Sequence, residues 1–151
     1  MLRALRAFGY TKLRVQYGRG KFVPRACGED DGLFDEMVDC FRFKPSLTHD
    51  MQRAGLIISH AGAGSIFEAL RMGKNLIVVI NDRLMDNHQA ELAEEMQALG
   101  HSYAATCSNL LDVIQSSDFG SRTPLSPEQL GVIPSVISEE LRHAAARPSQ
   151  D

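Results

Sequence analysis

The chain has 151 residues, of which 44% are hydrophobic and 23% are charged, a composition typical of a folded globular protein and not of a disordered segment. The length suits a single domain, and a formal net charge of −3 offers no basic surface for nucleic acid, so we expect no nucleic-acid partner. No apolar run approaches the roughly 18 residues that a membrane-spanning helix requires.

The three cysteines, Cys27, Cys40 and Cys107, lie far apart in the sequence. They form no C-x-x-C pair of the kind that binds zinc, and they are too few for a disulfide-rich secreted protein. We therefore expect reduced thiols and a cytoplasmic protein.

In the first half of the chain, short helices and strands alternate. The opening MLRALRAF has helical spacing and Gly9 ends it, whereas residues 12–18 alternate polar with β-branched and aromatic side chains, as strands do. Gly55 is expected to end a second helix. The predicted helices cover residues 1–8 and 46–54, the predicted strands cover 12–18, 37–43 and 56–59, and a loop covers 19–33.

From residue 56 onward the alternation becomes regular. Fully apolar runs such as NLIVVI indicate strands that are covered on both faces, and a glycine follows each of the next two helices. The strands are predicted at 75–80 and 102–106, and the helices at 65–72, 87–99 and 109–116. Residues 127–146 have helical spacing interrupted by Pro134, which fits two short helices or one kinked helix.

Strands that alternate with helices predict an α/β fold, a doubly wound parallel sheet with helices on both faces. Ligands of such sheets bind beyond the carboxyl ends of the strands. The stretch ISHAGAGSIFEAL, residues 58–70, passes from strand to helix at that edge. We therefore expect the binding site at this turn.

Two glycines at the turn indicate a site for an anion. Gly62 and Gly64 let a ligand approach the backbone and would cost nothing at positive φ, while the next helix directs its first N–H groups toward the same point. No Gly-Lys-Ser/Thr follows, which disfavours a P-loop kinase or ATPase, and no G-x-S-x-G nucleophile elbow is present.

The polar residues near the turn also have structural alternatives. Ser65 and Glu68 match S-x-x-E, the capping box of a helix start, which would explain both without a ligand. Asp86 and Gln89 can do the same at the next helix. His60, at the end of the strand, can be a structural polar residue. What favours binding is that all of them lie at the same edge of one predicted sheet.

One segment closely resembles a known enzyme family. It reads ISHAGAGSIFEALRMGKNLIVVINDRLMDNHQAELAEEMQALGH and covers residues 58–101. It is similar to the cytosolic catalytic subunits of the eukaryotic UDP-N-acetylglucosamine transferase, which add the second GlcNAc to dolichol-diphosphate-GlcNAc in N-glycan assembly. More distantly it resembles the donor-binding, Rossmann-like half of the bacterial MurG enzymes, GT-B glycosyltransferases of family 28. The resemblance runs from about Phe8 to Ile114.

The resemblance implies a role for each residue at the predicted edge. The donor diphosphate is implied to lie against the turn formed by Gly62, Ala63, Gly64 and Ser65. Glu68 falls where the family binds the ribose hydroxyls. The sugar hydroxyls of UDP-GlcNAc are implied to contact Asn87, His88 and Gln89. The leaving UDP is implied to be stabilised by His60, the one candidate catalytic residue.

The resemblance also implies a mechanism and a partner. The family displaces UDP directly at the anomeric carbon, with inversion and without a metal or other cofactor, and this chain contains no Asp-x-Asp metal motif. Family members carry only the donor-binding half, and a membrane-anchored subunit supplies the acceptor half. That partner is implied to bring the chain to the cytosolic face of the endoplasmic reticulum.

Residues 1–125 are expected to form the donor-binding domain, and residues 126–151 a helical tail that contacts the partner or packs on the domain. The family normally begins with a strand and a Gly-Thr-Thr type loop, whereas this chain begins within the next helix. A catalytic subunit is therefore weighed against a truncated, marginally stable form that acts as a non-catalytic binding or regulatory module. A dinucleotide-binding protein is disfavoured because no G-x-G-x-x-G follows the first predicted strand.

Overall fold

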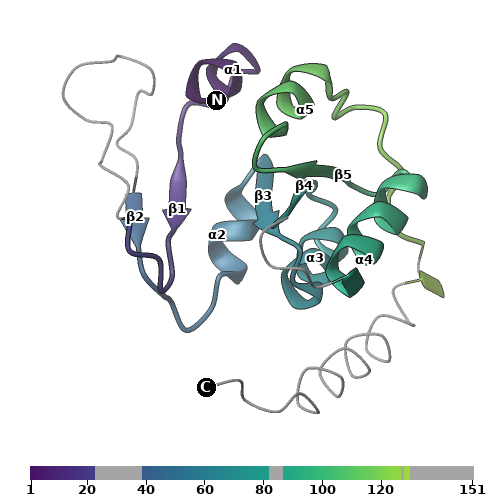
Figure 1. The fold of residues 1–151 in the computed structure, drawn as a ribbon, viewed down its shortest axis with the longest axis horizontal. Coiled ribbons are helices and arrows are strands. Elements are labelled where there is room, and N and C mark those ends of the chain that lie inside the picture. Colours follow the sequence, from purple (N-terminus) through teal and green to yellow (C-terminus); the bar gives the residue numbers. More distant parts are fainter. Residues whose placement is uncertain (23–38, 82–86, 127, 130–151) are drawn as a thin grey trace.

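The computed structural model describes residues 1–22, 39–81, 87–126 and 128–129. Helices and strands alternate along the chain, as predicted (Figure 1). The helices are α1 (Leu2–Ala7), α2 (Thr48–Arg53), α3 (Ala63–Arg71), α4 (Asn87–Ala98) and α5 (Leu110–Ser116). The strands are β1 (Arg14–Gln16), β2 (Asp39–Phe41), β3 (Leu56–His60), β4 (Asn75–Ile80) and β5 (Tyr103–Thr106). Most of the tail predicted at 126–151 lies outside the described residues, so the domain boundary stays a prediction.

Among the described residues the strands form two parallel sheets, where a single sheet was predicted. Within the described ranges β1 pairs with β2, and β4 lies between β3 and β5. Arg14 and Gln16 of β1 are exposed, a pattern typical of a peripheral strand. Arg14 Nε lies 3.1 Å from Oδ2 of Asp39, the residue that pairs with it in β2. The smaller sheet therefore has an exposed, charged character that the three-stranded sheet lacks.

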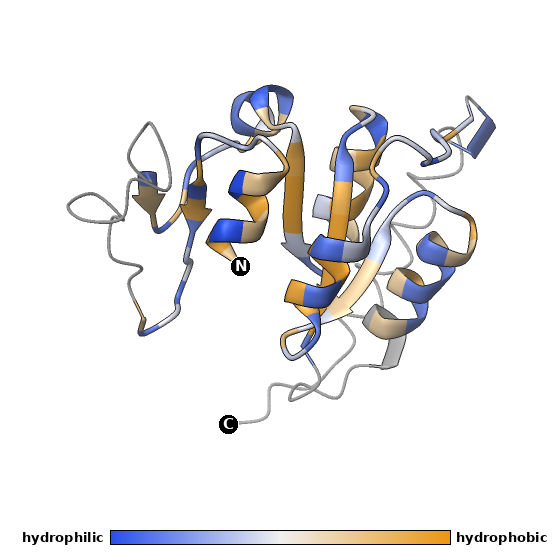
Figure 2. Ribbon diagram, turned by 90° about the horizontal axis from the view of Figure 1, so that it is seen from above, coloured by the Kyte–Doolittle hydropathy of each residue, from blue (hydrophilic) through white to orange (hydrophobic). Residues whose placement is uncertain are grey.

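Helices cover both faces of the three-stranded sheet, which confirms the predicted fold class (Figure 1). Alternate residues of β4 point to opposite faces because the side-chain period of a strand is two. Leu76 and Val78 pack with α3 and α4, whereas Ile77 packs with α1 and α5. All three side chains are fully buried. Figure 2 shows the hydrophobic strands in the middle of the molecule and mixed colouring on the helices around them.

Glycines end three helices as predicted, but Gly55 does not. Gly9, Gly73 and Gly100 have positive φ, which favours glycine after a helix. The helix α2 instead ends at Arg53, followed by an extended Ala54. Gly55 does not have positive φ, and a Cβ added there would lie 3.2 Å from Cε1 of Tyr10. The glycine therefore makes room for an aromatic ring and is not a helix stop.

Arg122 connects the amino ends of two strands at the edge opposite the predicted site. Its guanidinium donates to the Lys74 carbonyl oxygen at 2.6 Å, to Asn75 Oδ1 at 3.2 Å and to the His101 carbonyl oxygen. Burial lowers the pKa of this guanidinium. Three acceptors hold the half-buried charge, so the segment after α5 is fixed to the start of β4 and to the approach to β5.

His101 is buried and links this region to the beginning of the tail. Its Nδ1 donates to the Thr123 carbonyl oxygen at 2.7 Å, and its Nε2 lies 3.2 Å from Nε2 of Gln129. Ser126 N donates to Gln129 Oε1 at 2.7 Å, and Gln129 N donates to Ser126 Oγ at 3.2 Å. These reciprocal bonds are a capping box, which the sequence reasoning did not assign at this position.

Candidate functional site

The predicted turn lies at the carboxyl end of β3, where it joins α3 through two residues. Gly62 N donates to the His60 carbonyl oxygen at 2.8 Å, which makes the turn tight. Gly62 is the N-cap of α3 and has no side chain to accept from the first N–H groups of the helix. The first turn of α3 therefore presents donors that no side chain caps, at the positive end of the helix dipole.

Neither glycine of the turn has positive φ. Gly62 has φ of −79°, and Gly64 is an ordinary helical residue in the first turn of α3. A Cβ on Gly62 would lie only 2.8 Å from Nε2 of His60, whereas a Cβ on Gly64 would meet nothing within 4 Å. Gly62 is therefore explained by the imidazole ring packed beside it. Gly64 is exposed, and the fold itself does not explain it.

The capping-box alternative for Ser65 and Glu68 is wrong. Because α3 begins at Ala63, Ser65 is already the third helical residue and cannot be the N-cap. The carboxylate of Glu68 accepts a hydrogen bond from Thr48 Oγ1 at 2.8 Å instead. Glu68 is half-buried and reaches across to α2, so its side chain is held by tertiary structure and not by its own helix end.

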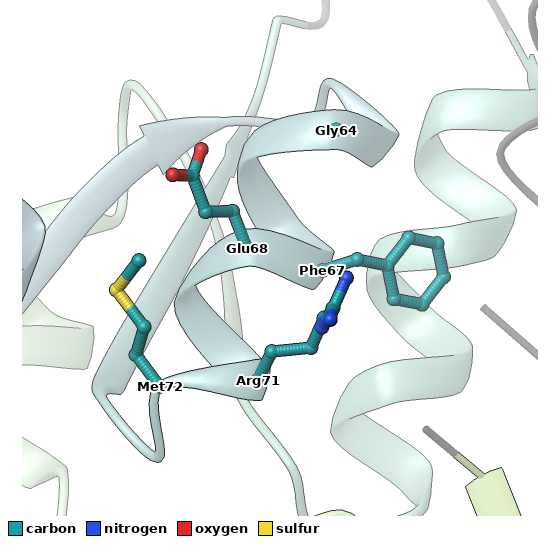
Figure 3. Close-up of a pocket in the computed structure, with 5 residues that line it drawn as sticks. All are labelled: Gly64, Phe67, Glu68, Arg71 and Met72. Atoms are coloured by element: carbon teal, nitrogen blue, oxygen red, sulfur yellow. The ribbon is translucent and has the colours of Figure 1, made fainter. Parts of the chain in front are cut away.

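A hollow of about 490 Å³ lies along the exposed side of α3. It is lined by Gly64, Phe67, Glu68, Arg71 and Met72 (Figure 3). Figure 3 shows Glu68 and Met72 on one side of the helix and Phe67 and Arg71 on the other. A group that approaches the bare backbone of Gly64 thus meets a carboxylate one helical turn further on. This combination suits a ligand that carries both an anion and hydroxyl groups.

His60 is the last residue of β3 and is exposed, so its ring is accessible from this edge. Asn87, His88 and Gln89 form the first turn of α4, after β4, and thus belong to the neighbouring βα unit. Their side chains, and the proposed Asp86 cap, lie outside the described residues. The backbone places them at the expected strand-to-helix position, and their roles stay predictions.

Sequence reasoning missed the contact of Thr48 with Glu68 and the contribution of Arg71 to the hollow. Arg71 could have been found, because it follows Gly64 by seven residues and Glu68 by three, spacings that place side chains near one another on a helix. Thr48 carries no such signal. It belongs to another helix, 20 residues before Glu68.

An ion cluster holds α2 in place beside this site. Asp50 Oδ2 lies 2.9 Å from Lys44 Nζ, and Asp50 Oδ1 accepts from an Arg14 guanidinium nitrogen. Hydrogen bonds from Lys44 and Arg14 lower the pKa of the Asp50 carboxyl. Met51, the next residue of α2, is buried. The helix that carries Thr48 is thus anchored both by charge and by an apolar contact.

Within the described ranges, His, Cys, Asp and Glu side chains form no group of three or more that could hold a metal ion. In the same part of the chain, no helix is both long and apolar enough to cross a membrane. Whether the site works without a metal stays a prediction.

Comparison with known proteins identifies the domain. Residues 3–129 match the family described as the glycosyltransferase family 28 C-terminal domain. The chain belongs to this family. The chain is 45% identical over 106 residues to the human protein named UDP-N-acetylglucosamine transferase subunit ALG13. It is 36% identical over 139 residues to the protein of the same name from Yarrowia lipolytica.

The aligned region makes up different fractions of the length of these relatives. The match covers 70% of this chain but only 9% of the human protein, and 89% of this chain and 69% of the Yarrowia protein. A solution NMR structure of ALG13 has a TM-score of 0.63 and 24% identity, with 91% of this chain and 83% of that chain covered. The structural match supports the α/β fold.

Proposed function

We propose that this family 28 domain is the donor-binding catalytic subunit of an N-acetylglucosaminyltransferase and that it binds UDP-GlcNAc beside α3. The observation that carries the proposal is the pairing of Gly64 with Glu68. Gly64 leaves open space next to the uncapped start of α3, and the Glu68 carboxylate stands one turn away in the same hollow. A nucleoside diphosphate has the matching groups, an anion and a ribose diol, at neighbouring positions.

Each residue then has a chemical role. The first N–H groups of α3, at Ala63, Gly64 and Ser65, donate to the diphosphate, because a helix start attracts anions. The Glu68 carboxylate accepts from the ribose hydroxyls. His60 stabilises the negative charge that develops on the leaving UDP. The GlcNAc hydroxyls contact the start of α4, with Asn87, His88 and Gln89 as their partners.

The proposed reaction is a direct displacement with inversion and without a metal. The acceptor hydroxyl oxygen forms a bond to the anomeric carbon as the bond from that carbon to the UDP oxygen breaks. UDP takes the electron pair, and the hydroxyl proton passes to a base or to solvent. We propose dolichol-diphosphate-GlcNAc as the acceptor.

A membrane-anchored subunit is the proposed partner, and it presents this lipid acceptor at the cytosolic face of the endoplasmic reticulum. The relatives are named as subunits, which supports an assembly with another chain. The partner supplies the acceptor site, and this chain supplies the donor site.

The test is GlcNAc transfer from UDP-GlcNAc to dolichol-diphosphate-GlcNAc by this chain co-expressed with such a partner. Glu68→Ala should lower kcat/KM by about ten- to hundredfold, because hydrogen bonds to a charged group contribute about 1.5–3 kcal/mol. Glu94→Ala, a change at an exposed position of α4, is the matched control and should retain activity. Equal activity of the Glu68→Ala protein and the wild type would contradict the proposal.

A further inference from the structure

A line of hydroxyl groups connects the start of α2 to the carboxylate of Glu68. Ser46 Oγ donates to Thr48 Oγ1 at 2.9 Å, and Thr48 Oγ1 donates to Glu68 Oε1 at 2.8 Å. The chain closes on the backbone, since Thr48 N donates to Ser46 Oγ at 3.2 Å. Three hydrogen bonds thus run in one direction and end on the carboxylate.

The direction follows from the chemistry of the groups. An ionised carboxylate only accepts hydrogen bonds, so the hydroxyl proton of Thr48 must point toward Glu68. The oxygen of Thr48 is then free to accept from Ser46, and successive bonds of this kind polarise and strengthen one another. The contact with Glu68 is charge-assisted, which makes it the strongest of the three.

The bond to Thr48 constrains a side chain that is otherwise free to turn. Glu68 projects from α3 toward the hollow, and a glutamate has several rotatable bonds. With Oε1 held by Thr48, the plane of the carboxylate is restricted. Oε2 and the second lone pair of Oε1 remain available to a ligand.

Thr48 can act in this way because α2 is itself fixed. Asp50, two residues further along α2, is paired with both Arg14 and Lys44, and Met51 is buried against the rest of the domain. The hydroxyl therefore projects from a rigid support, which is what a precise site needs.

We propose that Thr48 is a positioning residue for the donor: its hydroxyl holds the Glu68 carboxylate in the orientation that accepts from the ribose hydroxyls. This inference rests on the proposed function, since it assumes that Glu68 binds the ribose. Thr48 does not line the hollow and acts through Glu68.

The experiment measures the affinity of the full chain for two probes by calorimetry. UDP carries the ribose diol, and 2′,3′-dideoxyuridine diphosphate lacks it. Their affinity ratio isolates the contribution of the diol from that of the diphosphate and the base. The variants are Thr48→Val, which removes the hydroxyl at similar volume, and Thr48→Ser, which restores it. Glu68→Ala reports on the carboxylate itself.

In the wild type we expect the affinity for UDP to exceed that for the dideoxy probe by about tenfold or more. Thr48→Val should reduce this ratio by about three- to tenfold, mainly by weakening UDP, and Thr48→Ser should restore it. Glu68→Ala should bring the ratio close to one. This pattern supports the inference.

Two results would overturn it, and they are distinguishable. If Thr48→Val weakens both probes equally, or neither, while Glu68→Ala still removes the preference for UDP, the hydroxyl does not position Glu68 and the proposed function stands. If the wild type binds both probes alike, or binds neither, the ribose role of Glu68 fails, and the inference fails with it.

Discussion

At Gly64, the residue type that would best stabilise the fold differs from the residue type that the proposed ligand requires. Its backbone is helical, it is exposed, and no neighbouring atom would contact a side chain added there. Glycine in a helix is less stable than alanine by up to about 1 kcal/mol. The chain thus carries a destabilising residue for which the surrounding structure gives no reason, whereas a diphosphate close to the backbone does.

Gly64→Ala should therefore raise stability and lower donor binding. We expect the free energy of unfolding to increase by up to about 1 kcal/mol, because alanine loses less backbone entropy on folding. UDP affinity should fall, since the methyl group would occupy the space where the diphosphate approaches. Thermal unfolding and calorimetry with UDP check the two effects.

Gly73→Ala is the matched control for this substitution. Gly73 has φ of 63°, so alanine there should destabilise the protein by about 1–2 kcal/mol. A loss of stability in Gly64→Ala would mean that the fold itself requires this glycine. Unchanged UDP affinity would show that the bare backbone has no role in donor binding.

At the scale of elements, the start of α3 shows why a motif alone did not place the helix. The S-x-x-E pattern at Ser65 predicted a helix start there, yet only Ala61 and Gly62 separate β3 from α3. Ile66 N already bonds to the Gly62 carbonyl oxygen at 3.2 Å, so the chain is helical before Ser65. The start of α3 is therefore set by the short connection to β3 and not by the S-x-x-E motif.

The same motif is a true capping box at Ser126, where both reciprocal bonds form. The segment before it has no strand or helix between residues 117 and 126, so the backbone can adopt the N-cap geometry. The strand β4, by contrast, was predicted with the correct ends, because a continuous apolar run has only one favourable position in a covered sheet. The bond between Thr48 and Glu68 could not be predicted, since it depends on how α2 and α3 pack.

The stabilisation that the Asp50 ion pairs give to α2 should be lost at acid pH. The pKa of Asp50 is lower in the folded protein than in the unfolded chain, where it is about 3.9. The stabilisation is therefore fully present above about pH 4 and is lost as the pH falls through the lower folded value. Asp50→Asn should be less stable than the wild type at neutral pH, and this difference should shrink in acid.

Urea denaturation between pH 7 and pH 2 measures this dependence. Glu94→Gln removes one negative charge from an exposed position of α4 and serves as the control. A difference between Asp50→Asn and the wild type that stays constant down to pH 2 would mean that the ion cluster does not stabilise the fold.

At the scale of the whole molecule, the two edges of the three-stranded sheet differ in exposure and in the contacts that hold them. The carboxyl edge carries exposed His60 and Gly64, whereas the amino edge is held by the half-buried guanidinium of Arg122. A guanidinium held by hydrogen bonds thus lies at the edge opposite the proposed site. The sequence predicted the location of the site from the order of strands and helices, but it gave no sign of Arg122, whose three acceptors are brought together only by folding.

Arg122→Ala should destabilise the protein by about 2–4 kcal/mol, because three hydrogen bonds of about 0.5–1.5 kcal/mol each are lost and their acceptors are left without a partner. Arg122→Lys should restore part of this, since an ammonium cannot reproduce the planar array of donors. Urea denaturation measures the loss. Arg3→Ala, at an exposed position of α1, should change stability by less than about 0.5 kcal/mol. Equal stabilities of the Arg122→Ala and Arg3→Ala proteins would contradict this assignment.

The contacts of His101 have a consequence for spectroscopy. A carbonyl oxygen can only accept, so the bond to Thr123 places the ring proton on Nδ1 and leaves Nε2 as an acceptor for the Gln129 amide. The two ring nitrogens thus differ in protonation, and nitrogen-15 chemical shifts distinguish such states. Any event that draws Gln129 away would alter the shift of Nε2 first. The nitrogen-15 shifts of the buried His101 imidazole therefore report whether Gln129, near the start of the tail, is in contact with the domain.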